Sequence, residues 1–343
     1  MPRDCATPGE YRDEPDARRY ARRRETDDRR AIDGRDADAE TDRSRAEVVR
    51  VTDPAYLVVG GGNGLGAETA TELAREGANV VVSDLGTAVD GTGSDPAPAR
   101  EVAEEIESEI DGASAVAHFG DAADADDATE AVETALEAFG RLDGIANFAG
   151  ILRDGMSWTL SDEDWDAVVR THLRSNFTLL RAAVRHWRET DDPPEDRSVL
   201  AVSSRGALGN VGQLAYASAN AGILGFVRAA STELHRQDVR VNALVPNGYT
   251  RMTESIPEEH RPYTREEMPP EDVAPAAVYL LSEAAADVTG VTVTAAGDEI
   301  GILSEPRQIR TGVAEDGWTV DAVDEAFDSI ADGYETTRTE RFL

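Results

Sequence analysis

Apolar and polar positions follow two different rhythms along most of the chain. From Pro54 onward, short runs rich in Val, Ile, Leu and Ala alternate with longer segments whose apolar residues recur every three or four positions. The short runs are typical of buried strands, and the longer segments are typical of amphipathic helices. The predicted strands are Ala55–Val59, Asn79–Ser83, Ala115–Phe119, Gly144–Phe148, Ser198–Ser203, Arg240–Val245 and Val291–Ala295, and the predicted helices lie near 65–76, 97–110, 126–139, 161–188, 213–235 and 271–285.

This alternation of strands and helices predicts the fold class. Consecutive strands joined by helices pair in parallel through right-handed crossovers. We therefore expect an α/β fold with one doubly wound, Rossmann-like parallel sheet of about seven strands. No repeat or linker divides residues 46–300, so a single dinucleotide-binding domain is predicted there. Residues 301–343 follow as a C-terminal extension, with a further helical pattern at Val320–Ala331.

The first 45 residues lack this apolar pattern. Residues 1–50 hold 13 Arg against 14 Asp and Glu, and few residues there can build a core. Such a composition predicts a disordered, charged tail. A basic arm that binds nucleic acid is the alternative interpretation, but the interleaved acidic residues argue against it.

Composition limits the classes of partner. The formal net charge is −34, and every basic residue is an arginine. A charge this negative disfavours nucleic acid and anionic membranes as partners, and it suits a salt-rich cytoplasm where ions screen self-repulsion. We therefore predict a halophilic protein with an acidic surface. The regular apolar pattern argues against acidic disorder as the rival explanation.

The cysteine count and the lengths of the apolar runs exclude further kinds of site and segment. Cys5 is the single cysteine, which excludes an internal disulfide framework and a cysteine-based metal site, and no metal is predicted. The chain has no signal-peptide core and no apolar run of about 18 residues that would span a membrane. The expected location is cytoplasmic.

A glycine-rich turn separates the first predicted strand from the first helix. It carries Gly60, Gly64 and Gly66, with Asn63 and Leu65 between them. Free amides at a helix N-terminus attract phosphate, and glycines let a pyrophosphate approach the backbone. These five residues are predicted cofactor contacts. The spacing differs from Gly-x-Gly-x-x-Gly, and a simple turn is the alternative.

An acidic residue, Asp84, closes the second predicted strand 18 residues after Gly66. In a dinucleotide-binding unit, an acid at this point accepts hydrogen bonds from the adenosine ribose hydroxyls. A carboxylate also repels a 2′-phosphate, and the neighbouring Ser83 and Asn63 are neutral. NAD is therefore the predicted cofactor. The alternative is that Asp84 only begins a turn.

Two further strand ends supply candidate cofactor contacts. Asp121 follows the third predicted strand, and Asn147, Ala149 and Gly150 lie at the end of the fourth. Carboxyl ends of strands line the ligand crevice of a doubly wound sheet. Each residue taken singly has a loop as its simpler interpretation.

A serine and a tyrosine supply candidate chemistry. Ser203 ends the fifth predicted strand, and Tyr216 follows thirteen residues later on the next helix. A phenol can exchange a proton with a substrate oxygen that a serine hydroxyl orients, while hydride passes to or from a nicotinamide. A cation four residues after the tyrosine would lower its pKa, but that position holds Asn220. An ordinary strand-end serine and a packed tyrosine are the alternative.

Five motifs now stand in order between residues 50 and 300. They are Gly60–Gly66, Asn147–Gly150, Ser203 with Gly206, Tyr216–Asn220, and Arg240–Ala243 before Pro246. Their order and spacing resemble those of the short-chain dehydrogenase/reductase family. A closer resemblance is to the 3-hydroxyacyl-CoA dehydrogenase part of peroxisomal multifunctional enzymes, carried by Val80–Gly86, Gly150–Asp154, Gly209–Gln213 and Thr250–Thr253.

The resemblance assigns four active-site positions and shows two departures. The family's Asn, Ser, Tyr and Lys correspond here to His172, Ser203, Tyr216 and Asn220. In the family the lysine binds the nicotinamide ribose and lowers the pKa of the tyrosine; Asn220 can still hydrogen-bond the ribose but brings no charge. If His172 lies near Tyr216, a protonated imidazole is a hypothetical substitute. A packed helix histidine is the alternative.

Two functions follow from these observations. The first is an NAD-dependent oxidoreductase that interconverts a secondary alcohol and a ketone, and the resemblance suggests 3-hydroxyacyl-CoA as the substrate class. The second, motivated by Asn220, is a non-catalytic NAD-binding protein with a sensing or assembly role. The resemblance also implies a homodimer or homotetramer, assembled through the helices at 161–188 and 213–235.

Overall fold

An eight-stranded sheet forms the centre of the computed structural model, which describes residues 54–190, 196–315 and 317–332. The strand order is β3-β2-β1-β4-β5-β6-β7-β8. Strands β1 to β7 pair in parallel, and β8 runs antiparallel to β7. The strands are β1 Ala55–Val59, β2 Asn79–Asp84, β3 Ala115–Phe119, β4 Gly144–Asn147, β5 Arg197–Val202, β6 Val239–Asn247, β7 Thr292–Ala296 and β8 Glu299–Ile302.

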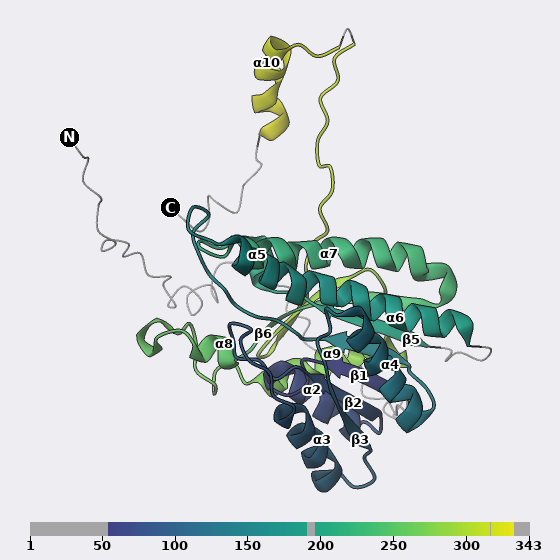
Figure 1. Cartoon of the computed structure of the whole chain (residues 1–343). Coiled ribbons are helices and arrows are strands. Elements are labelled where there is room, and N and C mark those ends of the chain that lie inside the picture. The colour runs from purple at the N-terminus through teal and green to yellow at the C-terminus, as the bar shows by residue number, and fades with distance from the viewer. Residues whose placement is uncertain (1–53, 191–195, 316, 333–343) are drawn as a thin grey trace, which may run out of the picture.

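Helices cover both faces of this sheet, which confirms the doubly wound α/β prediction. One buried cluster packs α2, α3 and α9 against it, and a second packs α4, α6 and α7 against the opposite face. Figure 1 shows α6 and α7 on one side of the sheet and α2 and α3 on the other. The helices are α2 Gly64–Arg75, α3 Ala97–Glu109, α4 Ala125–Phe139, α5 Asp162–Val169, α6 Ser175–Glu189, α7 Leu214–Leu234, α8 Arg251–Glu254, α9 Ala274–Leu281 and α10 Val320–Ala331.

Local sequence explains where several helices begin and end. Asp124 caps α4 by accepting hydrogen bonds from the amides of Asp126 and Asp127, and Gly140 ends that helix at φ +75°. Ser161 caps α5 through the amide of Asp164. Such caps satisfy amides that have no partner inside the helix, so they fix the boundaries.

The structure differs from the sequence predictions at several elements, of which two change the sheet and the helix that carries His172. The helix predicted over 161–188 is divided into α5 and α6 by a π-helical turn at Arg170–Arg174, which carries His172. An eighth strand, β8, extends the seven predicted ones through a tight hairpin that pairs Ala296 with Glu299. Both features are short, so they leave the apolar periodicity almost unchanged.

The predicted C-terminal helix is present as α10, but it packs differently from the others. None of its residues is buried, and in Figure 1 it stands away from the sheet at the end of an extended segment. An ion pair between Arg228 of α7 and Glu305 ties the base of this segment to the domain at 2.8 Å. The charged tail predicted over 1–45 lies outside the described residues. Among the residues that are described, no helix has the length and apolarity needed to cross a bilayer.

Candidate active site

A cavity of about 440 Å³ lies at the carboxyl ends of β1, β2, β4, β5 and β6. The strand order reverses between β1 and β4, and ligands of doubly wound sheets bind at such a reversal. Every predicted site residue except Asn147 lines this cavity: Gly60, Asn63, Gly64, Leu65, Gly66, Asp84, Asp121, Ala149, Gly150, His172, Ser203, Tyr216 and Asn220.

The glycine loop forms one end of the cavity as a tight backbone turn. Gly60 adopts φ +71°, and a Cβ on it would lie 2.7 Å from the amide nitrogen of Ala149. A Cβ on Gly66 would lie 2.1 Å from the carbonyl oxygen of Gly60. Only glycine fits at these two positions, because side chains would collide with backbone that cannot move aside. The loop therefore packs directly on the residues that follow β4.

The first turn of α2 leaves its amides free of a side-chain cap. The N-cap residue Asn63 is extended and makes no capping hydrogen bond. Uncapped amides and the helix dipole together suit a phosphate. This end of the cavity therefore fits the pyrophosphate of a dinucleotide, which the cavity-lining Gly64, Leu65 and Gly66 would contact.

The carboxylate of Asp84 is fixed against the glycine loop. One oxygen accepts a hydrogen bond from the amide of Gly62 at 2.8 Å, and the other accepts from the amide of Gly86 at 2.7 Å. Each carboxylate oxygen still has a lone pair for a further donor. The geometry is therefore compatible with two ribose hydroxyls binding at Asp84.

Of the predicted strand-end residues, Asp121 lines the cavity, whereas Asn147 lies behind the cavity wall. The Asp121 carboxylate forms an ion pair with Arg170 and also accepts from the amide of Ala123. Asn147 is buried behind the cavity wall, where it donates to the Ser175 hydroxyl at 2.8 Å and accepts from the amide of Ala149 at 3.1 Å. Asn147 thus holds the wall in place, whereas its position at a strand end predicted contact with the cofactor.

Tyr216 lies in the first turn of α7 with His172 beside it. The two rings meet edge to face, with centroids 5.0 Å apart and planes at 81°. The Nε2 atom of His172 lies 3.0 Å from the amide nitrogen and 2.9 Å from the carbonyl oxygen of Ile151. Burial lowers the pKa of His172, so the imidazole is neutral at neutral pH. The hypothesis of a protonated His172 that replaces the lysine charge is therefore disfavoured.

Two adjacent serines, Ser203 and Ser204, line the cavity together with Tyr216. Its side chain hydrogen-bonds the Tyr216 phenol and accepts from the amide of Gly206 at 3.1 Å. The Ser203 hydroxyl is buried and donates to the carbonyl of Asn220 at 2.9 Å. Both serines line the cavity, and adjacent residues in extended backbone point to opposite sides, so sequence spacing alone does not choose between the two hydroxyls. Two consecutive serines in the sequence were the signal for this ambiguity.

The electrostatic environment of Tyr216 favours a neutral phenol. Burial raises its pKa above the ordinary value, the negative charge of Asp154 and the nearby Tyr263 phenol raise it further, and the hydrogen bond from Ser204 only partly opposes them. The Asn220 amide is directed to the Tyr216 carbonyl at 3.0 Å, within its own helix. No basic side chain in the described part of the chain is among the groups that set this pKa.

Sequence reasoning missed a loop that lines the cavity. Residues 86–95, which we call the strap, join β2 to α3. The Val89 carbonyl accepts from the amide of Leu152 at 2.8 Å, and the Asp90 carbonyl accepts from Arg153 at 2.7 Å. Thr87, Val89 and Gly91 of the strap therefore line the cavity beside the loop that follows β4. The sequence of the strap is mostly Gly, Thr, Asp and Ser, as in many loops, so no motif pointed to this position.

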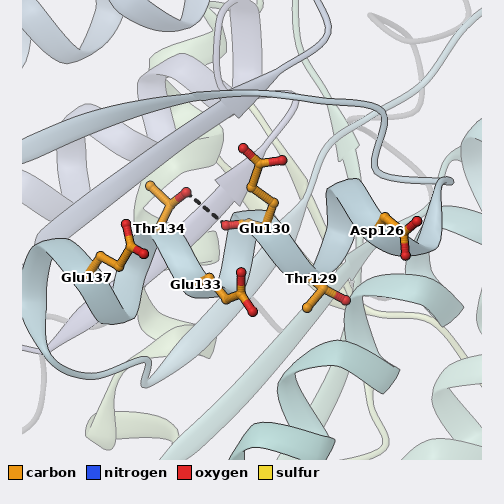
Figure 2. Close-up of a pocket in the computed structure, with 6 residues that line it drawn as sticks. All are labelled: Asp126, Thr129, Glu130, Glu133, Thr134 and Glu137. Atoms are coloured by element: carbon orange, nitrogen blue, oxygen red, sulfur yellow. Dashed lines mark hydrogen bonds between the residues drawn. The ribbon is translucent and has the colours of Figure 1, made fainter.

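A second hollow, drawn in Figure 2, is lined by one helix alone. Its lining side chains extend from α4 and are Asp126, Thr129, Glu130, Glu133, Thr134 and Glu137. The hydrogen bond drawn there runs from the Thr134 hydroxyl to the Glu130 carbonyl, so it does not link the carboxylates. No set of His, Cys, Asp and Glu within the described ranges is grouped to hold a metal ion. This hollow is an acidic helix face.

Comparison with known proteins gives matches that cover the same part of the chain. The family model described as enoyl-(acyl carrier protein) reductase matches residues 60–297. A Mycobacterium tuberculosis protein assigned to the short-chain type dehydrogenases/reductases is 42% identical over 247 residues, which cover 72% of this chain and 84% of that protein. The crystal structure of a short chain dehydrogenase from Mycobacterium avium superposes with a TM-score of 0.70 at 33% identity, covering 81% of this chain and 94% of that one.

Two further relatives carry more specific names. A hydroxyacyl-CoA dehydrogenase of Mycobacterium tuberculosis is 36% identical over 265 residues, covering 74% of this chain and 80% of that enzyme. The mouse peroxisomal multifunctional enzyme type 2 is 37% identical over 253 residues, covering 74% of this chain. The match spans only 33% of the mouse enzyme, so most of that protein has no counterpart in the matched region.

Proposed function

The chain belongs to the short-chain dehydrogenase/reductase family, and we propose that it is an NAD-dependent oxidoreductase that interconverts a secondary alcohol and a ketone. The observation that carries this proposal is the shared cavity. The Tyr216–Ser204 pair lines the same cavity as the uncapped glycine loop and the Asp84 carboxylate. A proton-exchanging phenol and a dinucleotide cradle are the two parts that carbonyl–alcohol chemistry needs.

Asp84 supports NAD over the phosphorylated cofactor. Its carboxylate is fixed by two backbone amides at the end of β2, where an adenosine ribose would lie. A 2′-phosphate placed there would meet a negative charge at close range. When it is bound, the nicotinamide supplies or accepts the hydride.

The side chains of the cavity then have distinct roles. We assign orientation of the substrate oxygen to Ser203, as the sequence predicts, or to its neighbour Ser204, and we assign proton exchange to Tyr216. Because burial and the nearby Asp154 carboxylate raise the pKa of Tyr216, the phenol is protonated at neutral pH. A neutral phenol donates a proton to a forming alkoxide, so at neutral pH the site suits ketone reduction better than alcohol oxidation.

The names of three relatives support a substrate class. One is a hydroxyacyl-CoA dehydrogenase, and the other two are peroxisomal multifunctional enzymes, of which the chain matches only a part. We propose 3-hydroxyacyl-CoA and 3-oxoacyl-CoA as the alcohol and ketone. The test is NADH oxidation by wild-type protein with 3-oxoacyl-CoA esters in concentrated KCl. NADPH in place of NADH is the control for cofactor choice, and equal rates with both would contradict the role of Asp84.

Asn220 favours a second candidate function. It occupies the position that the family resemblance gives to lysine, and its amide is directed to the helix backbone. A protein that binds NAD without turning it over, and acts in sensing or assembly, is consistent with that residue. Tight NADH binding with no turnover on a panel of ketones and 3-oxoacyl-CoA esters would favour this alternative.

We also propose that the protein is located in a salt-rich cytoplasm. We further propose that it forms a homodimer or homotetramer. In the two predicted interface helices, some apolar residues pack inside the domain, for example Val168 and Ile223, which are buried. Phe177 of α6 and Leu214 of α7 stay about half exposed, and they support burial against a second copy. Light scattering in concentrated KCl tests this, and a monomer would contradict it.

A further inference from the structure

The cavity contains one arginine whose charge is not balanced by a carboxylate. Arg153 pairs with Asp164 at 3.1 Å, and Arg170 pairs with Asp121. Arg251 also lines the cavity, but within the described residues no carboxylate forms an ion pair with it. Over residues 51–343 the chain has 54 acidic residues and only 21 arginines. A cavity cation without an acidic partner is therefore unexpected here.

Arg251 is located beside the phosphate end of the cavity. It is the first residue of α8, directly after the helix-capping Thr250. The Thr250 methyl group lies 3.5 Å from the position that a Cβ of Gly64 would occupy. The start of α8 therefore covers the open side of the glycine loop, and it brings Arg251 to the groove between that loop and the strap.

The contact that Arg251 does make is with a neutral group. Its Nη1 donates to the Thr87 carbonyl at 3.2 Å. Thr87 lies three residues after Asp84 in the strap. Hydrogen bonds from Leu152 and Arg153 to strap carbonyls hold the strap in position. A guanidinium has five N–H donors in a planar fork, and one backbone carbonyl uses a single donor. The remaining donors suit the paired oxygens of a phosphate.

We propose that Arg251 binds a phosphate group of the ligand, namely the dinucleotide pyrophosphate, on the side opposite the glycine loop. This inference rests on the proposed NAD-dependent function. The glycine loop then contributes backbone amides from one side, and Arg251 contributes a full positive charge from the other. The phosphates of a coenzyme A thioester have the same chemistry, so the test separates these two sources.

The experiment measures binding, with Arg251→Gln as the test variant and Arg251→Lys as the charge-retaining variant. Arg265→Gln is the matched control, because Arg265 is exposed, pairs with Glu271 and does not line the cavity. NADH is titrated by fluorescence, and ADP-ribose, adenosine and coenzyme A are titrated by calorimetry, with coenzyme A added in the presence of saturating NAD. Circular dichroism checks that each variant is folded.

The proposal expects Arg251→Gln to weaken NADH and ADP-ribose by about tenfold, the size of one charge-assisted contact. Adenosine and coenzyme A should bind as they do to wild type, and Arg251→Lys should recover part of the loss. Unchanged NADH affinity in Arg251→Gln overturns the inference, and a loss confined to coenzyme A assigns the arginine to the substrate instead. If wild-type protein binds no NADH, the proposed function itself fails, and the inference fails with it.

Discussion

Asn220 is the residue that most alters the chemistry of the site. A lysine ammonium at this position would favour the phenolate of Tyr216, whereas the amide of Asn220 donates to the Tyr216 carbonyl and adds no charge. Burial therefore dominates, and the pKa of the phenol is raised. Alcohol oxidation needs the phenolate, so its rate should increase as the pH rises toward that pKa.

Replacing Asn220 with lysine should lower the pKa of Tyr216 and move the pH–rate profile for oxidation to lower pH. If the lysine makes the phenol about tenfold more acidic, the phenolate population below the pKa rises about tenfold, and the oxidation rate should rise with it. The measurement is kcat/KM across pH in concentrated KCl. Asn220→Gln is the neutral control and should leave the profile in place; a lysine variant whose profile does not move would contradict this explanation.

Alanine substitutions at the two adjacent serines should have different effects, one on catalysis and one on stability. Ser204→Ala removes the hydroxyl that meets the Tyr216 phenol, and loss of one such donor typically lowers kcat by about 100-fold. Ser203→Ala instead leaves the buried Asn220 carbonyl without that donor, and should lower the free energy of unfolding by about 1–3 kcal/mol. Steady-state kinetics and denaturant unfolding of both variants test this. The reverse pattern would return the catalytic role to Ser203.

At the level of elements, the glycine loop shows how the fold positions the cofactor. Gly66 and Gly225 both lie inside helices. A Cβ on Gly66 would lie 2.1 Å from the Gly60 carbonyl oxygen. A Cβ on Gly225 would meet only the flexible end of the Arg228 side chain, at 3.6 Å. The first position therefore requires glycine for packing of α2 on the loop. The second tolerates a methyl group.

Gly66→Ala should destabilise the protein by about 1–3 kcal/mol, as overpacking usually does, and should also weaken NADH binding. Gly225→Ala should stabilise it by about 0.5–1 kcal/mol, because alanine has the higher helix propensity. Denaturant unfolding and NADH fluorescence measure both effects. If the two variants had equal stability, close approach of the loop to α2 would not be the reason for glycine at residue 66.

The sequence was sufficient to predict the strands and helices that follow a strong apolar pattern. Continuous apolar strands and amphipathic helices predicted the sheet, and the spacing of Gly60, Asp84 and Tyr216 placed one cavity at the strand ends. The edge strand Glu299–Ile302 was missed because it contains a glycine and buries none of its residues, and the π-helical turn at Arg170–Arg174 because it continues the helical pattern on either side. The strap and the choice of Ser204 depend on contacts between distant segments, which periodicity does not encode.

For the whole molecule, the dominant property is its charge. The formal net charge of −34 is concentrated in residues 51–343, where acidic residues outnumber arginines by 54 to 21. Self-repulsion of this size opposes the compact state, and salt at 1 M reduces the screening length to about 3 Å. The protein should therefore depend on salt for stability.

We expect the unfolding temperature to rise steadily between about 0.2 M and 2 M KCl, as the added ions screen the acidic surface. Calorimetry or circular dichroism measures it, with sucrose at matched osmolality as the uncharged control, which distinguishes screening from general exclusion. An unfolding temperature that KCl does not change would contradict adaptation to a salt-rich cytoplasm.

The most direct test of the proposed chemistry follows deuterium from NADH deuterated at the nicotinamide C4 position into the alcohol formed from a 3-oxoacyl-CoA ester. We predict that wild-type protein transfers the label in concentrated KCl. We also predict that Tyr216→Phe binds NADH with unchanged affinity and forms labelled alcohol at least about 100-fold more slowly. Wild-type protein that binds NADH tightly and transfers no label, or a Tyr216→Phe variant as fast as wild type, would contradict the assignment.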